Sequence, residues 1–158
     1  MNAPTAIAKL SVEDLVARIS SGDVSPGAGS AGAVALALAA ACAGKAVSVT
    51  LRHLPDELRL SSSLACFRQI ARFALADADR DSEAFEAFIR SRSSTSVARL
   101  IGEGERVAHL IAALESGINE VEALVRSNVT GDLLAARALL AAARRIQEND
   151  ERESLQNR

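Results

Sequence analysis

The chain has 158 residues and a formal net charge of −2, with 49% hydrophobic but only 3% aromatic residues. This length suits a single domain with a real core, and the charge argues against a nucleic-acid partner, because such proteins carry a basic surface. With so few large side chains, the core must be built from close Ala, Leu, Val and Ile contacts, which is typical of helices packed on helices.

The termini and cysteines indicate a cytoplasmic protein. Residues 1–10 lack the basic region and apolar stretch of a signal peptide. The apolar run 29–44 is shorter than the ~20 residues of a membrane span, so no membrane partner is expected. Cys42 and Cys66 lie in apolar helical patterns without metal-type spacing. We therefore expect buried free thiols in a reducing compartment.

The first predicted helix begins after Ser11, which serves as its N-cap, and acidic residues follow in its first turn. Leu15, Val16 and Ile19 form its apolar face. The helix ends near residues 20–22, and a loop over 23–29 carries Pro26.

The second predicted helix is rich in alanine and runs from about Ser30, its N-cap, to His53, with Pro55 ending it. The segment 27–32 matches the dinucleotide pattern GxGxxG, but it lacks the strand that this pattern needs, so we regard the match as accidental. Free N–H groups at a helix start, beside glycines that allow close approach, favour an anion. A simple turn with a capping serine explains the same residues equally well.

The third predicted helix has the clearest periodicity, and one member of its buried stripe is a carboxylate. The stripe consists of Leu60, Leu64, Phe67, Ala71, Ala74, Ala78, Asp81, Phe85 and Phe88. An unpaired carboxylate in a core costs several kcal/mol, so Asp81 is either functional or satisfied in another way. The alternatives are an ion pair with Arg52 or Arg137, or a position facing a water-filled end of the bundle.

Two more helices complete the predicted fold. A linker over 91–96 precedes a helical region over 97–125, which Gly117 is expected to kink or divide. The last helix starts near Asp132 and turns Leu133, Ala136, Leu140 and Ala143 inward. We expect an all-α, antiparallel bundle of about five helices over residues 1–146, with a fraying or disordered tail over 147–158.

Four further polar residues have simple structural interpretations. Asn128 is suited to end a helix in a left-handed conformation, and Asp132 is suited to cap the next one. Asp77 and Asp79 flank Asp81, but no histidine joins them, so a solvated acidic turn is expected rather than a metal site.

Three motifs in the same order resemble the cyclodeaminase and methenyltetrahydrofolate cyclohydrolase family. Pro-Gly-Ala-Gly-Ser-Ala-Gly-Ala over 26–33 resembles its PGGGS-x-A-A motif. Asp-Ser-Glu-Ala-Phe over 81–85 is similar to its D-x-x-A-F motif. Asn-Val-Thr-Gly-Asp over 128–132 is similar to its N-x-x-S-D element. Together the motifs bracket most of the chain.

The resemblance implies an all-helical homodimer that acts on one-carbon derivatives of tetrahydrofolate. Members release ammonia from the formimino compound or hydrolyse the methenyl compound, with neither a metal nor an organic cofactor expected. The implied catalytic residue is Asp81. The implied substrate-binding residues are Pro26, Gly27, Gly29, Ser30, Asn128 and Asp132.

The chain departs from the family pattern in several places. Ala28 replaces the central glycine of the first motif, where a Cβ would deny the backbone a positive φ or crowd a ligand. Gly131 replaces a serine, and the Leu-Pro pair that follows D-x-x-A-F is absent. A non-catalytic helical homodimer of the same fold, serving as a subunit, binding or regulatory protein, is therefore the alternative. An enzyme acting on another amidine or imine carbon is a third possibility.

Overall fold

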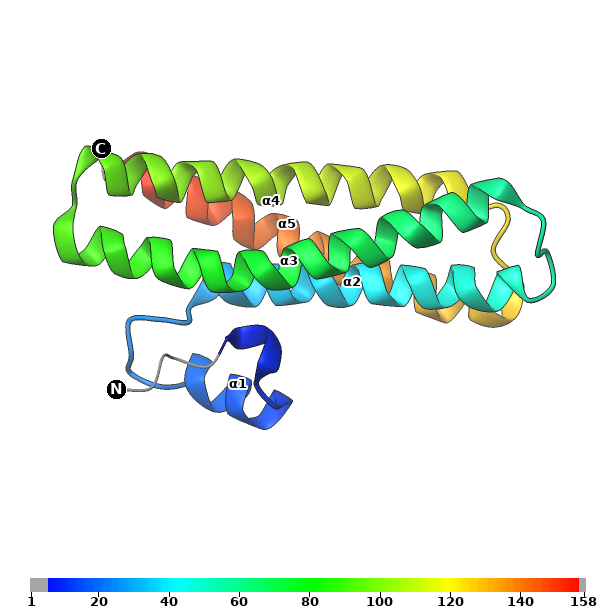
Figure 1. Ribbon diagram of the computed structural model, residues 1–158, viewed down its shortest axis with the longest axis horizontal. Helices are drawn as coiled ribbons and strands as arrows, with labels where there is room; N and C mark the ends of the chain where they lie inside the picture. The colour runs from blue at the N-terminus through cyan, green and yellow to red at the C-terminus, as the bar shows by residue number, and fades with distance from the viewer. Residues whose placement is uncertain (1–5, 157–158) are drawn as a thin grey trace.

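The computed structural model describes residues 6–156, with side chains described to residue 153, and consists of four long helices in a bundle with a short helix beside one end (Figure 1). The elements are η1 (Ile7–Lys9), α1 (Val12–Ile19), α2 (Ala28–Leu51), α3 (Leu58–Ser91), α4 (Ser94–Val121), η2 (Ser127–Val129) and α5 (Thr130–Gln156). The described residues form no strand. The predicted all-α class with five α-helices is therefore confirmed.

The core is built from small and branched side chains, as the composition predicted. Helix α2 packs against α3 and α5, and α4 packs against the same two helices. The predicted inward residues of α5 are confirmed, since Leu133, Ala136, Leu140 and Ala143 are all buried. The predicted stripe of α3 is confirmed for Leu60, Phe67, Ala74 and Ala78, but it is wrong for Phe85, which is exposed near the C-terminal end of the helix.

Helix α2 is the one described helix that is long and apolar enough to cross a membrane, and half of its most apolar window is buried within the bundle. A buried core helix is expected to have this composition. The helix starts two residues earlier than predicted, with Gly27 at the N-cap position, and ends at Leu51. Ser30 is therefore not the cap but a buried residue inside the first turn.

Helix α1 is capped as predicted, because the Ser11 hydroxyl accepts a hydrogen bond from the backbone N–H of Asp14. Its apolar face, however, stays largely in solvent, with Val16 60% exposed and Ile19 38% exposed. A hydrogen bond of 2.6 Å from the Ile7 backbone N–H to an Asp79 oxygen connects this N-terminal unit to α3. Asp79 is therefore part of a tertiary contact and not a solvated turn residue.

Several predictions at the helix ends are wrong. The predicted linker over 91–96 shrinks to two residues between α3 and α4, and Arg92 there has the left-handed φ of 44°. Asn128 does not end a helix in a left-handed conformation, because it lies in η2. Arg92 is the only non-glycine residue with positive φ in the described part of the chain. Asp132 lies within the first turn of α5 and not at its N-cap, because the helix begins at Thr130.

Gly117 neither kinks nor divides α4. A Cβ built there would lie 2.6 Å from a ring carbon of Phe67, so the glycine serves a close approach between helices. The expected fraying from Gln147 is also wrong, because α5 continues to Gln156; residues 157 and 158 lie outside the described residues. Both cysteines are free, as predicted, but Cys42 is only partly buried and Cys66 is exposed.

Candidate functional site

A cavity of about 470 Å³ lies at the end of the bundle where α2 begins and α5 ends. The same end of the bundle holds the connection from α3 to α4 (Figure 1). Four helices line the cavity. The start of α2 contributes residues, and so do α3 between Asp77 and Phe88, α4 between Val97 and Val107, and α5 between Gln147 and Glu153. This volume is in the range of small-molecule sites.

The first turn of α2 is shaped around the carboxylate of Asp81. A Cβ built on Gly29 would lie 2.3 Å from Asp81 Oδ1, which is much closer than two such atoms can approach. Only glycine at this position leaves Asp81 its place against the helix N-terminus. There, free backbone N–H groups and the helix dipole favour negative charge. The anion expected at this helix start is thus supplied by the chain itself.

Ser30 holds the same carboxylate from inside the helix. Its side chain is fully buried, and its hydroxyl lies 2.9 Å from Asp81 Oδ2, 2.9 Å from Ser82 Oγ and 3.1 Å from the carbonyl oxygen of Ala78. A hydroxyl has one proton to donate, and the bond to a carboxylate is the strongest of these. Ser30 therefore orients Asp81 rather than starting the helix.

The electrostatics of Asp81 reflect both burial and these hydrogen bonds. Burial raises the pKa of the Asp81 carboxyl above its ordinary value, and hydrogen bonds from the hydroxyl and backbone of Ser30 oppose the rise. The suggested ion pair with Arg137 is wrong, since that guanidinium donates to Glu122 and Asn119. Arg52, the other suggested partner, is exposed at the C-terminal end of α2, away from the first turn that holds Asp81.

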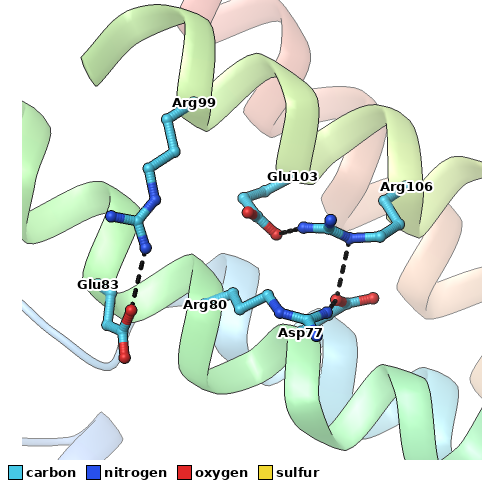
Figure 2. A network of polar contacts seen from close by, with 6 residues as sticks. All are labelled: Asp77, Arg80, Glu83, Arg99, Glu103 and Arg106. Atoms are coloured by element: carbon cyan, nitrogen blue, oxygen red, sulfur yellow. Dashed lines mark hydrogen bonds and ion pairs between the residues drawn. The ribbon is translucent and has the colours of Figure 1, made fainter. Parts of the chain in front are cut away.

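A second acidic residue of α3, Asp77, is buried in an ion-pair network between α3 and α4 (Figure 2). Its side chain is 1% exposed, and Oδ1 accepts hydrogen bonds from Arg80 and, at 3.2 Å, from Arg106. Arg106 also pairs with Glu103. The expectation of a solvated acidic turn is therefore wrong for Asp77. Its other oxygen, Oδ2, is buried and has no hydrogen-bond partner among the described residues.

The cavity contains one functional candidate that the sequence analysis missed. Asp150 lines it from α5, and burial, reinforced by the negative charges of Asp81 and Glu153, raises the pKa of Asp150 to about 6. The charged composition of 147–158 favoured a disordered tail. The spacing of Leu140 and Ala143, continued by Gln147 and Asp150 at intervals of three and four, was the signal that places Asp150 on the inner face.

The remaining residues of the first motif differ in their position relative to the cavity. Gly27 lines the cavity, while Pro26 is buried and does not line it. Ala28 lines the cavity as the first residue of α2. Its φ is not positive, since Arg92 is the only described residue with a positive φ. The predicted conflict between a Cβ at Ala28 and the backbone conformation therefore does not arise.

Asn128 and Asp132 lie at the opposite end of the bundle. Asn128 is exposed in η2, and Asp132 lies in the first turn of α5, neither of them lining the cavity. At about 1.5 Å per helical residue, Asp132 is roughly 27 Å along α5 from Asp150. A single chain does not bring them to Asp81, so their role in substrate binding stays a prediction.

No arrangement of three or more His, Cys, Asp or Glu side chains suited to a metal ion occurs within residues 6–153. The chemistry available at the cavity is that of carboxyl groups, hydroxyls and a helix N-terminus. No Lys, Arg or His is among the described residues that line it. Such a lining attracts a cationic or neutral group of a ligand and repels an anionic group.

The comparison with protein families gives one match. A model of the family described as formiminotransferase-cyclodeaminase matches residues 11–99. This segment extends from the cap of α1 to the start of α4, and it includes Gly29, Ser30 and Asp81 but not Asp150. No curated protein matches the chain.

Proposed function

Because this chain belongs to the formiminotransferase-cyclodeaminase family, we propose that it is a folate one-carbon enzyme that uses Asp81. The reaction is either release of ammonia from formiminotetrahydrofolate or hydrolysis of methenyltetrahydrofolate. The observation that carries the proposal is the partly buried Asp81 carboxylate, held by Ser30 at the N-terminus of α2 and facing an acidic cavity of about 470 Å³.

The geometry suits the charge of the reacting group. The methenyl bridge and the protonated formimino group are both delocalised cations, and a fixed carboxylate in a cavity stabilises such a charge. Asp81 also suits the task of positioning and deprotonating the attacking water or amine. These roles need only protein carboxyl groups, so we propose that neither a metal nor an organic cofactor takes part.

We also propose that the protein acts as a cytoplasmic homodimer. The outward side of α2 has an apolar stretch that ends at the exposed Lys45, with Leu38 51% exposed beside Ala41 and Cys42. An exposed apolar stripe on a helix is typical of a self-association surface. The exposed thiol of Cys66 suits a reducing compartment. The same stripe favours the second candidate, a non-catalytic helical homodimer.

The test mixes the purified protein with methenyltetrahydrofolate and follows loss of its near-ultraviolet absorbance; formation of the same absorbance is followed with formiminotetrahydrofolate. Turnover that Asp81→Asn abolishes and Glu86→Gln leaves intact supports the enzyme, since Glu86 is an exposed carboxylate on the same helix. Absence of turnover together with absence of a thermal shift by either folate would contradict the enzyme.

Light scattering separates the second candidate from the first. A dimer that Leu38→Lys converts to a monomer, without turnover of either folate by the native chain, favours the non-catalytic homodimer. A native chain that is monomeric at micromolar concentration contradicts the dimer, both for the enzyme and for the non-catalytic protein.

A further inference from the structure

The acidic cavity contains a second partly buried carboxyl group, Asp150, that the chemistry assigned to Asp81 leaves unused. Asp81 enters the cavity from α3 and Asp150 enters it from α5, and the charge of Asp81 acts directly on Asp150. Two carboxyl groups in one cavity divide acid and base roles when their surroundings differ. The surroundings of these two differ in hydrogen bonding.

Asp81 is surrounded by donors and Asp150 is not. Asp81 receives the Ser30 hydroxyl at 2.9 Å and a backbone hydrogen bond from the same residue, which stabilise its ionised form. Among the described residues, no hydrogen-bond donor reaches the carboxyl of Asp150. Of the two groups, Asp150 is therefore the one that keeps a proton.

The other charged groups around the cavity reinforce this division. The remaining charged residues that line it are all acidic, Asp77 from α3, Glu103 and Glu105 from α4, and Glu151 and Glu153 from α5, while α2 contributes none. Arg80 and Arg106, two cations beside this lining, are bound to Asp77. Nothing in the described lining therefore stabilises a negative charge on Asp150.

An independent observation indicates that this wall faces a ligand. Asp77 is 1% exposed and lines the same cavity, yet its Oδ2 has no hydrogen-bond partner among the described residues. A buried acceptor without a donor costs about 1–3 kcal/mol, so such atoms call for an explanation. A bound molecule that carries N–H groups is a suitable donor.

We propose that Asp150 is the proton donor of this site, giving its proton to the nitrogen that leaves the one-carbon unit while Asp81 stays ionised. This role rests on the proposed function. It makes Asp150 a catalytic residue outside the segment that matches the family, supplied by the last turns of α5.

The proton balance closes for ammonia release. The folate nitrogen forms a bond to the carbon of the protonated formimino group, and its own proton passes to Asp81. The bond from that carbon to the departing nitrogen breaks, the nitrogen keeps the electron pair and takes the proton of Asp150, and ammonia leaves. Proton exchange with water then restores both carboxyl groups. No oxidant or reductant is needed.

The same roles apply to hydrolysis of the methenyl compound. Water forms the new carbon–oxygen bond and gives a proton to Asp81. The ring nitrogen leaves the carbon with its electron pair and takes the proton of Asp150. The remaining hydroxyl proton goes to solvent as the formyl carbonyl forms, so the reaction releases one proton overall.

The experiment compares pH profiles of kcat and KM for the native chain, Asp150→Asn and Glu148→Gln with both folates. Glu148 is the matched control, because it is an exposed carboxylate on the same helix. We expect Asp150→Asn to lower kcat about 10²–10⁴-fold with KM changed only a few-fold. The native profile falls as pH rises through the pKa of the donor, about 6, and the variant lacks this fall.

The possible failures are distinguishable. Native kcat and an unchanged alkaline limb in Asp150→Asn would overturn the donor role and leave the proposed function intact. A native chain that turns over neither folate overturns both. If Asp150→Asn does not fold, Asp150→Glu decides: a shifted alkaline limb with retained turnover supports the role, and an unshifted limb overturns it.

Discussion

Two glycines on two helices allow close contacts of opposite character. Gly29 on α2 allows the carboxylate of Asp81 to lie against a helix N-terminus, and Gly117 on α4 allows the ring of Phe67 to lie against a helix backbone. The first contact lines a cavity, whereas Phe67 is fully buried in the main apolar cluster. The same steric device therefore positions a chemical group at one place and fills the core at another.

The two contacts have opposite effects on the stability of the bundle. Burying an aromatic ring stabilises the fold by several kcal/mol, because a well-packed core loses about 3–5 kcal/mol when such a ring is removed. Burying a carboxylate against other carboxylates has the opposite sign. The end of the bundle with the cavity is thus expected to be the less stable and the more reactive end.

The largest effect is expected from a substitution of Asp81, the carboxylate of the polar contact. Asp81→Asn keeps the shape of the side chain but removes the negative charge that we propose stabilises the substrate cation. We expect kcat/KM to fall about 10³-fold, or about 4 kcal/mol in transition-state stabilisation, with helicity unchanged. Steady-state kinetics and circular dichroism measure the two. Retained turnover in a folded variant would mean that another carboxylate carries the reaction.

Replacing each glycine by alanine should have opposite consequences, with loss of stability at position 117 and loss of activity at position 29. In Gly117→Ala the new Cβ meets the buried ring of Phe67, and overpacking costs about 1–3 kcal/mol of unfolding free energy while activity stays native. In Gly29→Ala the new Cβ meets the end of the Asp81 side chain, which can rotate into the cavity. Activity should then fall more than about tenfold with little loss of stability, since alanine favours helix by roughly 1 kcal/mol.

Denaturant titration and kinetics on both alanine variants test this exchange. A loss of stability in Gly29→Ala that equals the loss in Gly117→Ala, without loss of activity, would remove the distinction between the two ends.

A smaller effect is expected when Ser30 loses its hydroxyl. In Ser30→Ala the carboxylate of Asp81 loses a charge-assisted hydrogen bond that lowers its pKa, so burial raises the pKa further. Because the proposed function requires the ionised form of Asp81, the acidic limb of the pH–rate profile should move to higher pH. Activity at mildly acidic pH should fall about tenfold. The profile of Ser82→Ala serves as the control for loss of a neighbouring hydroxyl, and coincident profiles for both variants would contradict the role of Ser30.

The smallest expected effect concerns stability at the acidic end. The pKa of Asp150 is about 6 in the folded chain and 3.8 in the unfolded reference, so the folded state binds more protons between these values. Stability therefore decreases as pH rises through this window, and the penalty is complete above it. At pH 8, Asp150→Asn should be more stable than the native chain by about 1 kcal/mol, given partial solvent screening.

This advantage should largely vanish near pH 3.5, where the carboxyl is mostly protonated in both states. Thermal melts at the two pH values measure it. An advantage that does not depend on pH would mean that the carboxyl of Asp150 is not the source.

The sequence predicted the helices and singled out Asp81 as a polar member of an apolar stripe, because both inferences depend on periodicity. A stripe with a period of 3.6 residues identifies a buried face, and a carboxylate in that stripe stands out wherever the helix packs. The helix ends were harder to predict. Gly27 and Ser30 both suit the start of a helix, and which one serves depends on Asp81, which lies 51 residues further along the chain than Ser30.

The rest of the site could not be predicted from local pattern alone. Asp150 sits in a strongly charged segment whose composition favours disorder, and its partial burial results from the packing of α5 beside α2 and α4. Asp77 looked like a surface residue because its partners include Arg106 on α4, 29 residues away in the chain. The periodicity of one helix does not indicate which charged residues of another helix will pair with it.

The contact between Gly29 and Asp81 also constrains how this protein can vary among its relatives. A side chain at position 29 and a carboxylate at position 81 compete for the same few ångströms of space. The two positions should therefore be inherited as a single unit, and a lineage that acquires a larger residue at 29 should lose the acid at 81 soon afterwards. Descendants that have lost both are expected to keep the bundle and to have abandoned the chemistry.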